Sequence, residues 1–517
     1  MTSDSPFFEK PVDGLKRKVT RGVAWTTSLH VVSKAVELVF TATLARLLAP
    51  TEFGIVAAAL VFITFAKLFV EIGVGATIVQ LPNLSRNDVR TGGTIVMLSA
   101  ALFFVATQLA APAAAALFGI AEVEGVLRLL AFIFLLQAVG VIPENLLLRR
   151  LKAPRVMIVE TASRLIGYGA IGALCAWYGL GYWSLAIGAL AEVAIKAVTL
   201  ALAVRAPMAP MLYGPSLRRL LSMGASFSLS RILNYIATSA DKVIAGRYLG
   251  AAALGLYGRA YHLMSVPADL YGRVGDRLVF PAMAACQHDA GRLRRAFLSG
   301  TSIAATLGVP MTIALVLLAP ELITFLLGQA WIGVIAPLMV LGAASYFRLG
   351  ARVGGSLLRA TGSLRSLVWT QAGYASAILT GCILAAPYGV NAIAAVVSVT
   401  AGAVFLAISA LACQRAQASL RTFIAAHVHG MLLGLLTATV LGALVFTLRA
   451  LHAPDYAILF AAGFAMVAGG ALLIARPQRW LIGEPAVELA EDFRARVDAR
   501  LSRLGLFRGA RAGERSV

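Results

Sequence analysis

Apolar stretches of 20 or more residues recur along this chain from Val23 to about Ile474, and short polar or charged segments separate them. Each stretch is long enough to cross the hydrocarbon core of a bilayer, which takes about 20 helical residues. The pattern predicts an all-α polytopic membrane protein with about fourteen transmembrane helices. Their expected cores are residues 23–47, 54–80, 91–117, 126–147, 157–177, 182–204, 223–249, 252–280, 296–319, 331–356, 366–386, 389–411, 424–449 and 455–475.

Basic residues precede the first predicted helix and fill every second connection. The intervening connections are nearly free of them, with Arg46, Arg128, Arg247 and Arg449 as the main exceptions. Because positively charged loops stay in the cytoplasm, the alternation predicts a multi-pass protein of the bacterial inner membrane with both termini cytoplasmic. The first apolar segment is too long for a signal-peptide core, so we expect an uncleaved anchor. The basic positions include Lys16, Arg17, Arg86, Arg90, Arg149, Arg150, Lys152, Arg155, Arg218, Arg219, Arg292, Arg294, Arg359, Arg365, Arg415 and Arg421.

The composition narrows the class of protein. Of the 517 residues, 59% are hydrophobic and only 13% are charged, which is about half the charged fraction of a soluble domain. The net charge of +21 lies in loops and in the tail, so anionic membrane lipids account for it and no nucleic-acid partner is expected. The four cysteines are scattered, with no paired spacing and no histidine cluster beside them. They predict packing residues, with no redox or metal site.

The chain contains a faint repeat of itself. Ala45–Ala49 followed by Phe53–Ile55 is echoed about 200 residues later by Gly246–Gly250 followed by Leu254–Leu256. Further echoes in the same order are Leu148-Arg149 with Leu358-Arg359 and Tyr178-Gly179 with Tyr388-Gly389. Both copies begin on the cytoplasmic side, so we expect parallel repeats.

Two parallel repeats predict two six-helix lobes around a central cavity that opens to either side of the membrane. We expect an N-lobe over residues 23–205 and a C-lobe over residues 223–411, joined by a cytoplasmic linker at 206–222. Residues 424–475 add two helices outside the repeat. A basic segment at residues 1–22 and a basic amphipathic tail at residues 476–517 complete the chain, and the tail is suited to the inner leaflet.

Polar side chains inside the predicted helices form two stripes that coincide under the repeat, one on the first helix and one on the seventh. A charge at the bilayer centre costs about 2.5–3.5 kcal/mol, so the stripes predict the lining of a cavity. Cations outnumber carboxylates in the seventh and eighth helices, which favours an anionic ligand. The candidate substrate-binding residues are His30, Lys34, Glu37, Lys67, Glu71, Arg231, Asn234, Arg259, His262, Arg273, Arg348 and Arg352.

A structural explanation of these charges stays open. Several of them form i,i+4 pairs that can neutralise each other and do nothing else. The eighth helix can also be shorter than drawn, which would leave Arg273 in cytoplasmic solvent. His30 and His262 have the chemistry of proton switches, although a histidine in a polar stripe also serves as a hydrogen-bonding partner. The i,i+4 pairs are Lys67/Glu71, Glu160/Arg164 and Glu192/Lys196.

No sequence motif indicates an enzyme. The chain has no Gly-x-x-x-x-Gly-Lys-Ser/Thr loop, no His-Glu-x-x-His and no Gly-x-Ser-x-Gly. His427 and His429 lack an acidic neighbour and do not indicate a metal site. We therefore expect no catalytic residues, no metal and no cofactor.

Several short motifs, in a fixed order, resemble the bacterial polysaccharide transporters. These are the Wzx-like oligosaccharide flippases of the multidrug/oligosaccharidyl-lipid/polysaccharide (MOP) exporter superfamily, whose fold is MATE-like. The resemblance covers roughly residues 14–420. Its motifs are Leu44–Pro50 with Glu52-Phe53-Gly54, Glu71–Gly75 with Ile78–Gln80, Asp241–Ile244 with Gly246, Leu249-Gly250, Leu254-Gly255 with Tyr257, and Phe280-Pro281.

The resemblance implies alternating access and an oligosaccharide on a polyprenyl-pyrophosphate carrier. This substrate would move from the cytoplasmic to the periplasmic leaflet during exopolysaccharide, capsule or O-antigen (lipopolysaccharide) synthesis, with a polymerase or chain-length regulator as partner. A pyrophosphate head needs cations, for which Lys34, Arg231, Arg259 and Arg352 are candidates. Ion coupling would use Glu37, Asp241 or Asp269.

Other functions stay open on the same sequence. A flippase for the lipid-linked cell-wall precursor would share the fold. A multidrug/cation antiporter would favour an acidic cavity, against the excess of arginine. A membrane polysaccharide polymerase or ligase would need a long outer loop, and a scaffold would not need aligned polar stripes.

Overall fold

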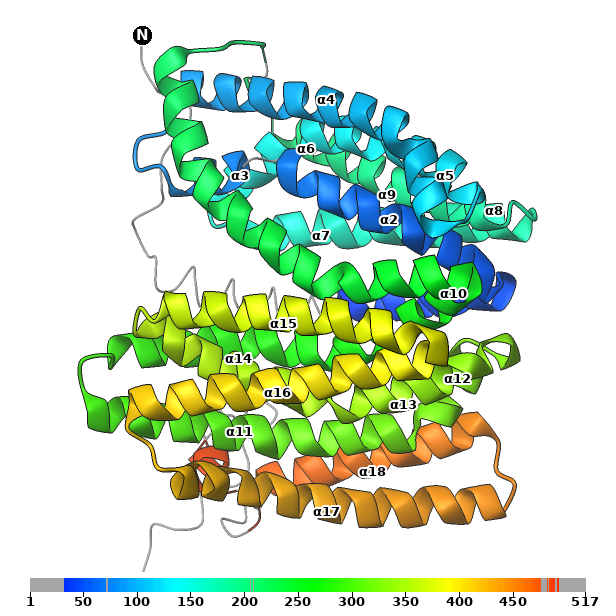
Figure 1. Ribbon diagram of the computed structural model, residues 1–517, viewed down its shortest axis with the longest axis vertical. Coiled ribbons are helices and arrows are strands. Elements are labelled where there is room, and N and C mark those ends of the chain that lie inside the picture. The colour runs from blue at the N-terminus through cyan, green and yellow to red at the C-terminus, as the bar shows by residue number, and fades with distance from the viewer. Residues whose placement is uncertain are drawn as a thin grey trace, which may run out of the picture. The chain divides into compact units, whose positions relative to one another are not determined.

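The computed structural model describes residues 32–70, 73–204, 206, 207, 209–475, 481, 483–488 and 491. All regular elements within these residues are helices, and Figure 1 shows their arrangement. They are a first helix over residues 32–47, then α2 (Pro50–Val70), α3 (Val74–Gln80), α4 (Arg86–Phe118), α5 (Glu122–Leu130), α6 (Phe132–Arg149), α7 (Ala153–Ser163), η1 (Arg164–Ile171), α8 (Gly172–Trp177), α9 (Tyr182–Ala203), α10 (Gly214–Ala285), α11 (Ala290–Leu317), α12 (Ala319–Leu326), η2 (Gln329–Val334), α13 (Ile335–Ala343), α14 (Ser345–Ala360), α15 (Leu364–Ala385), η3 (Ala386–Tyr388), α16 (Val390–Ala416), α17 (Leu420–Ala450) and α18 (Asp455–Ala475).

Ten helical segments of the described chain are long and apolar enough to cross a membrane. They are α2, α4, α5 with α6, α9, α11, η2 with α13 and α14, α15 with η3, α16, α17 and α18. The protein is therefore an all-helical, polytopic membrane protein, as the apolar pattern predicts.

The other four predicted cores are not among these ten segments. The first helix is described from residue 32 onward, and the core at 157–177 is a run of α7, the π-helix η1 and α8. The remaining two cores lie in α10, which has 72 residues and one break at Gly250, with φ 79° and ψ −176°. Only glycine adopts that conformation readily. Gly250 thus divides α10 into two arms.

The described residues form two compact units. Unit 1 takes in the chain up to Ala260, together with Leu326–Val334 and Ala375–Val396. Unit 2 takes in Tyr261–Phe325, Ile335–Tyr374 and the residues from Val397 onward.

In unit 1, α2 and the second arm of α10 cross at two glycines. A Cβ atom on Gly54 would lie 1.7 Å from the carbonyl oxygen of Ala251, and one on Gly255 would lie 1.9 Å from that of Pro50. Gly255 follows Gly54 by the same 201 positions that separate Ala251 from Pro50. The contact is therefore reciprocal, like the contact across a two-fold axis, and it joins residues that the sequence repeat pairs.

In unit 2, the core lies between α11, α14, α16 and α17. Its largest buried side chains include Phe297, Phe405 and Phe423. A Cβ atom on Gly430 would lie 2.5 Å from the carbonyl carbon of Ala305, so α11 and α17 are in backbone contact there. Helix α17 therefore packs directly on the core of unit 2, and α18 joins it through a small cluster of Ala314, Leu441 and Ala462.

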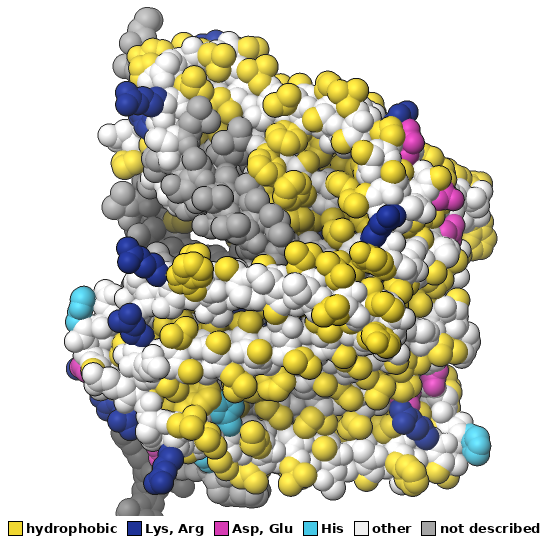
Figure 2. All heavy atoms as spheres, viewed as in Figure 1, with side chains coloured by type: hydrophobic (Ala, Val, Ile, Leu, Met, Phe, Trp, Pro, Cys, Tyr) yellow, Lys and Arg dark blue, Asp and Glu magenta, His cyan; other side chains and the backbone are white. Residues whose placement is uncertain are grey.

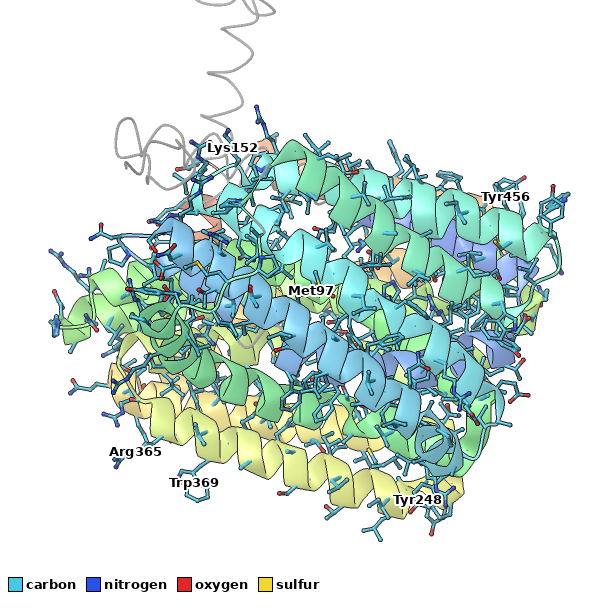
Figure 3. The ribbon with its side chains drawn as sticks, turned by 90° about the horizontal axis from the view of Figure 1, so that it is seen from above. Met97, Lys152, Tyr248, Arg365, Trp369 and Tyr456 are labelled. Carbon is cyan, nitrogen blue, oxygen red and sulfur yellow. The ribbon has the colours of Figure 1, made fainter. Side chains whose placement is uncertain are left out.

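The surface of each unit fits a bilayer. Figure 2 shows hydrophobic side chains covering the visible face, with Lys and Arg gathered toward the ends of the helices. In unit 1, Lys152 and Tyr248 lie toward opposite ends, as do Arg365 and Tyr456 in unit 2 (Figure 3). An apolar band between charged ends is the pattern of a membrane-spanning bundle.

Candidate functional site

Asp241 and Tyr257 join the two arms of α10 across the break at Gly250. The Tyr257 hydroxyl donates to Asp241 Oδ2 over 2.6 Å, and the Lys242 amide donates to Oδ1 over 2.9 Å. Tyr257 is fully buried and Asp241 is 3% exposed. Buried carboxylates need such donors, so these two motif residues fix the corner where α10 changes direction.

Arg259, on the second arm of α10, lies in an aromatic pocket of unit 1. Its guanidinium carbon is 4.3 Å from the centre of the Phe53 ring, and it interacts with Tyr168 on η1. Trp331 packs edge-on to Phe53 at 5.1 Å and donates its indole N–H to the carbonyl of Ala45 over 2.7 Å. Arginine over an aromatic face is a favourable cation–π arrangement.

Arg164 stands at the centre of a charge cluster in unit 1, here called the Arg164 cluster (Lys34, Glu37, Glu160, Arg164 and Glu192). Its guanidinium lies 3.0 Å from Glu37 and 3.2 Å from Glu192, and the more exposed Glu160 is 3.7 Å away. Lys34 pairs with Glu37 over 3.1 Å. The side chains of Arg164, Glu37, Glu192 and Lys34 are only 18–23% exposed. Two cations thus face three carboxylates inside the helical bundle.

Close backbone packing brings the Arg164 cluster together. A Cβ atom on Gly167 would lie 2.2 Å from the amide nitrogen of Glu192, and one on Gly169 would lie 2.6 Å from the Phe40 ring. The π-helix η1 begins at Arg164 itself. Single turns of π-helix occur often at functional sites because they re-aim side chains.

In unit 2, three arginines share one face of α14. Arg348 and Arg352 are four positions apart, and Arg359 follows seven positions later. Arg348 donates to the Tyr261 hydroxyl over 2.9 Å and lies 5.1 Å from the centre of that ring. Arg352 and Arg359 are exposed, whereas every residue between them is buried. The last turns of α14 therefore expose only these two arginines and, in part, Ala351.

The structure thus brings together the predicted residues Lys34 and Glu37, and it places Arg348 and Arg352 on one face. Lys67 lies in the last turn of α2 and His262 on the second arm of α10, both half-buried. For six other candidates the structure describes either no part of the residue or only its backbone. They are His30, Glu71, Arg231, Asn234, Asp269 and Arg273. The terminal segments 1–22 and 492–517 also lie outside the described residues.

The i,i+4 explanation of the helix charges is incomplete. Glu160 does lie near Arg164, at 3.7 Å. Glu192, however, bonds Arg164, and Lys196 pairs with Glu144 on α6 over 3.0 Å. These pairs connect different helices, which spacing along one helix does not predict. Tyr168 and Arg359 were not among the predicted site residues. Two sequence features could have indicated them. Tyr168 lies four positions after Arg164, on the same helix face, and Leu358-Arg359 echoes Leu148-Arg149.

Comparisons with known proteins assign this chain to a protein family. The family model described as "Polysaccharide biosynthesis protein" matches residues 43–336. The succinoglycan biosynthesis transport protein ExoT of Rhizobium meliloti (strain 1021) is 28% identical over 327 residues, which span 61% of this chain and 64% of ExoT. The lipopolysaccharide biosynthesis protein WzxC of Escherichia coli (strain K12) is 24% identical over 366 residues, 67% of this chain and 70% of WzxC. The teichuronic acid biosynthesis protein TuaB of Bacillus subtilis (strain 168) is 23% identical over 350 residues, 67% of this chain and 72% of TuaB.

Solved structures show the same fold. The lipid II flippase MurJ, in an inward closed conformation, superposes with a TM-score of 0.68 over 86% of this chain and 99% of MurJ, at 11% identity. An inward-facing multidrug resistance MATE transporter of the MOP superfamily gives a TM-score of 0.56 over 74% of this chain and 94% of that chain, at 13% identity. At these identities the likeness concerns the fold alone. Since the family match takes in more than half of the chain, the protein belongs to the polysaccharide biosynthesis protein family, Wzx-like in type, and is a multi-pass membrane transport protein with the fold of the MOP superfamily.

Proposed function

We propose that the protein flips a polyprenyl-pyrophosphate-linked oligosaccharide from the cytoplasmic to the periplasmic leaflet of the bacterial inner membrane. The names of the similar proteins ExoT, WzxC and TuaB connect them to succinoglycan, lipopolysaccharide and teichuronic acid synthesis. The product would be an exopolysaccharide, capsule or O-antigen. The protein would act as a transporter, with no covalent chemistry of its own.

The observation that carries this proposal is a long stretch of the chain that has arginines and no acidic residues. Residues 322–454 contain seven arginines and no Lys, Asp or Glu. Residues 112–244, which pair with them at the offset of the Leu-Arg echo, contain twelve basic and six acidic residues. A pyrophosphate head group needs cations, and arginine binds phosphate through two parallel N–H groups. One arginine of the stretch, Arg449, is paired with Glu321 over 2.6 Å. A cavity for cationic drugs would need the opposite charge.

The proposed architecture has fourteen spans in two six-helix lobes, residues 23–205 and 223–411, with α17 and α18 added and both termini in the cytoplasm. The reciprocal contact of Gly54 and Gly255 supports two repeats related by a two-fold axis. In this mechanism the lobes rock about such an axis. The head group enters from the cytoplasm and leaves outside, while the lipid tail stays in the bilayer.

Ion coupling is part of the proposal. Glu37 contacts both Lys34 and Arg164 inside the helical bundle, and Arg259 also interacts with it, so protonation of this carboxyl would change several ion pairs at once. This favours Glu37 as the coupling group. Asp241 and Asp269 are the other candidates, and the hydrogen bonds of Asp241 favour a structural role for it.

The test is transport in proteoliposomes. A fluorescent polyprenyl-pyrophosphate oligosaccharide would be incorporated, and its access to an impermeant glycosidase would be followed with and without the protein. Protein-dependent access of more than half of the lipid, against about half in protein-free vesicles with both leaflets loaded, supports the proposal. Equal access in both preparations, with export of a cationic dye, would contradict it.

A second candidate is the lipid-linked cell-wall precursor, because MurJ superposes with a TM-score of 0.68. That lipid carries the same pyrophosphate head and a different sugar. Competition by lipid II in the same assay separates the two substrates. Inhibition at equimolar lipid II would favour the cell-wall precursor.

A further inference from the structure

We infer that the segment Leu326–Val334, here called the latch segment, keeps the periplasmic side of the protein closed, and that Trp331 leaves its seat in unit 1 each time this side opens. The latch segment belongs to unit 1, whereas the chain on both sides of it belongs to unit 2. The inference rests on the proposed function, which supplies the opening step and the topology that places the connection before residue 331 outside.

Trp331 is the fully buried centre of the latch segment. Its ring meets the Phe53 ring of α2 edge-on, with 5.1 Å between the ring centres, and its indole N–H donates to the carbonyl of Ala45 over 2.7 Å. Leu327 and Val334 are also buried, at 1% and 0% exposed, while the residues directly beside Trp331 are exposed. The segment is thus held along one apolar edge, with Trp331 at its middle.

The Ala45 carbonyl is an acceptor that its own helix leaves open. The first helix ends at residue 47, and in a longer helix this carbonyl would accept from the amide of Ala49. That amide donates instead to Glu52 Oε2 over 2.7 Å. Because Ala45 is 2% exposed, its carbonyl needs another donor, which Trp331 supplies. A water molecule that enters as Trp331 leaves can replace the indole, so release does not strand the carbonyl.

The sequence repeat provides a contact to compare with this one. Gly246 stands 201 positions after Ala45, and a Cβ atom on Gly246 would lie 2.5 Å from the Phe118 ring at the end of α4. An aromatic side chain therefore packs at this position in both halves. The chain around Phe118 stays in unit 1, whereas the chain around Trp331 continues into unit 2 on both sides. A movement of unit 2 relative to unit 1 thus pulls on the Trp331 contact and leaves the Phe118 contact in place.

The latch segment has a hinge near its start. Gly328 has φ 93°, a conformation that glycine adopts without strain. No described atom lies within 4 Å of the place where its Cβ would be. Hinges are a few loop residues of this kind that absorb a change in φ and ψ. The segment can therefore swing about Gly328 without displacing packed side chains there.

Leu256 of α10 and Gly333 allow a covalent test. A Cβ atom on Gly333 would lie 2.9 Å from Leu256 Cδ1 and 3.7 Å from its Cγ, so cysteines at the two positions are within reach of a disulfide, whose Cβ atoms lie about 3.5–4.5 Å apart. Full-length Leu256→Cys/Gly333→Cys, with the native cysteines replaced by alanine, would be oxidised, checked by mass spectrometry and assayed for flipping of a polyprenyl-pyrophosphate oligosaccharide in proteoliposomes.

We expect the oxidised double variant to flip at least about tenfold more slowly than the reduced one, with recovery after reduction. Each single variant, treated with the same oxidant, is the control and should keep its rate. Equal rates before and after complete cross-linking would overturn the latch.

A labelling arm separates failure of the latch from failure of the proposed function. Ala45→Cys in the same cysteine-free protein would be reacted with a water-soluble maleimide in the proteoliposomes, and Val123→Cys, at a position of α5 that is 0% exposed, is the buried control. We expect Ala45→Cys to react at least about tenfold faster, because its cover opens. Equal labelling at both positions would overturn the latch even where flipping is seen. Faster labelling at Ala45→Cys without flipping would remove the proposed function and leave a segment that opens.

Discussion

Arg149 and Arg359 follow a leucine at corresponding places in the two halves of the sequence, yet they have different surroundings. Arg149 is 3% exposed and donates to four backbone carbonyls, those of Ile78, Val79, Leu81 and Pro82, at 2.6–3.4 Å. Arg359 is exposed and lies back over Gly355. One arginine therefore holds a loop in place, and the other is accessible.

The different surroundings of the two arginines depend on the helix next to each of them. The carbonyls bound by Arg149 lie at the end of α3, where the helix stops at Gln80 and leaves them without helical partners. The residues 201 positions later, from 279 to 283, lie in the last turns of α10, which continues to Ala285, and the carbonyls of Ala282 and Met283 accept from Cys286. The second half therefore has no loop at this place for Arg359 to hold.

The same contrast extends to the other charges. Arg164 in unit 1 is surrounded by three carboxylates, whereas the arginines of α14 lie in a stretch without acidic residues. The charged partners of the arginines thus differ between the two halves. Four sets of substitutions sharpen or break this comparison.

The largest effect is expected for Arg149→Gln. Loss of a buried guanidinium leaves several carbonyls without donors, and we expect a stability loss of about 3–5 kcal/mol. The matched change Arg359→Gln should cost under about 0.5 kcal/mol, as for an exposed residue. Thermal unfolding midpoints of the two purified variants in the same detergent measure the difference. Equal shifts would show that the two arginines have the same role.

Arg164→Met should be nearly as costly, by about 3 kcal/mol, because it leaves the carboxylates of the cluster with Lys34 alone. The loss should shrink as the pH falls from 8 to 5, since protonated carboxyls no longer repel each other. Glu160→Gln is the control. Its carboxylate is 41% exposed and 3.7 Å from Arg164, so we expect less than about 1 kcal/mol. A pH-independent loss in Arg164→Met would indicate that packing, and not charge, is what the arginine supplies.

Gly54→Ala and Gly255→Ala should destabilise unit 1 by similar amounts, about 2 kcal/mol each, because each methyl group would overlap a backbone oxygen. Gly258→Ala has no atom within 4 Å of the new Cβ and should be neutral or slightly stabilising. Unfolding midpoints of the three variants test the reciprocal crossing. A large effect at one glycine only would break the symmetry of the contact.

The smallest effect is expected for Gly355→Ala. The new methyl group fits beside Arg359 Nη1 at 3.7 Å, so helix propensity should raise stability by about 0.5–1 kcal/mol. Thermal unfolding midpoints of the variant and of wild type measure the change. A lower midpoint for Gly355→Ala would show that the position beside Arg359 has no room for a methyl group.

The sequence predicts much of the fold, because apolar length and loop charge are local signals. The helical cores, the motif at the α10 corner and the pairing of Lys34 with Glu37 on one face are of this kind. The break at Gly250 and the convergence of Arg164 with Glu37 and Glu192 depend on which glycines let helices approach, and periodicity along one helix does not contain that information. The different surroundings of Arg149 and Arg359 depend on where distant segments stop being helical, so the Leu-Arg echo alone could not predict them.

The central claim is that the protein flips a polyprenyl-pyrophosphate-linked oligosaccharide, with Arg352 among the candidate cations for its head group. The most direct test compares flipping of a polyprenyl-pyrophosphate oligosaccharide in proteoliposomes that contain wild type, Arg352→Gln or Arg365→Gln at equal amounts of folded protein. We predict a loss of at least about tenfold in rate for Arg352→Gln and the wild-type rate for Arg365→Gln. Equal rates in all three preparations would contradict the account.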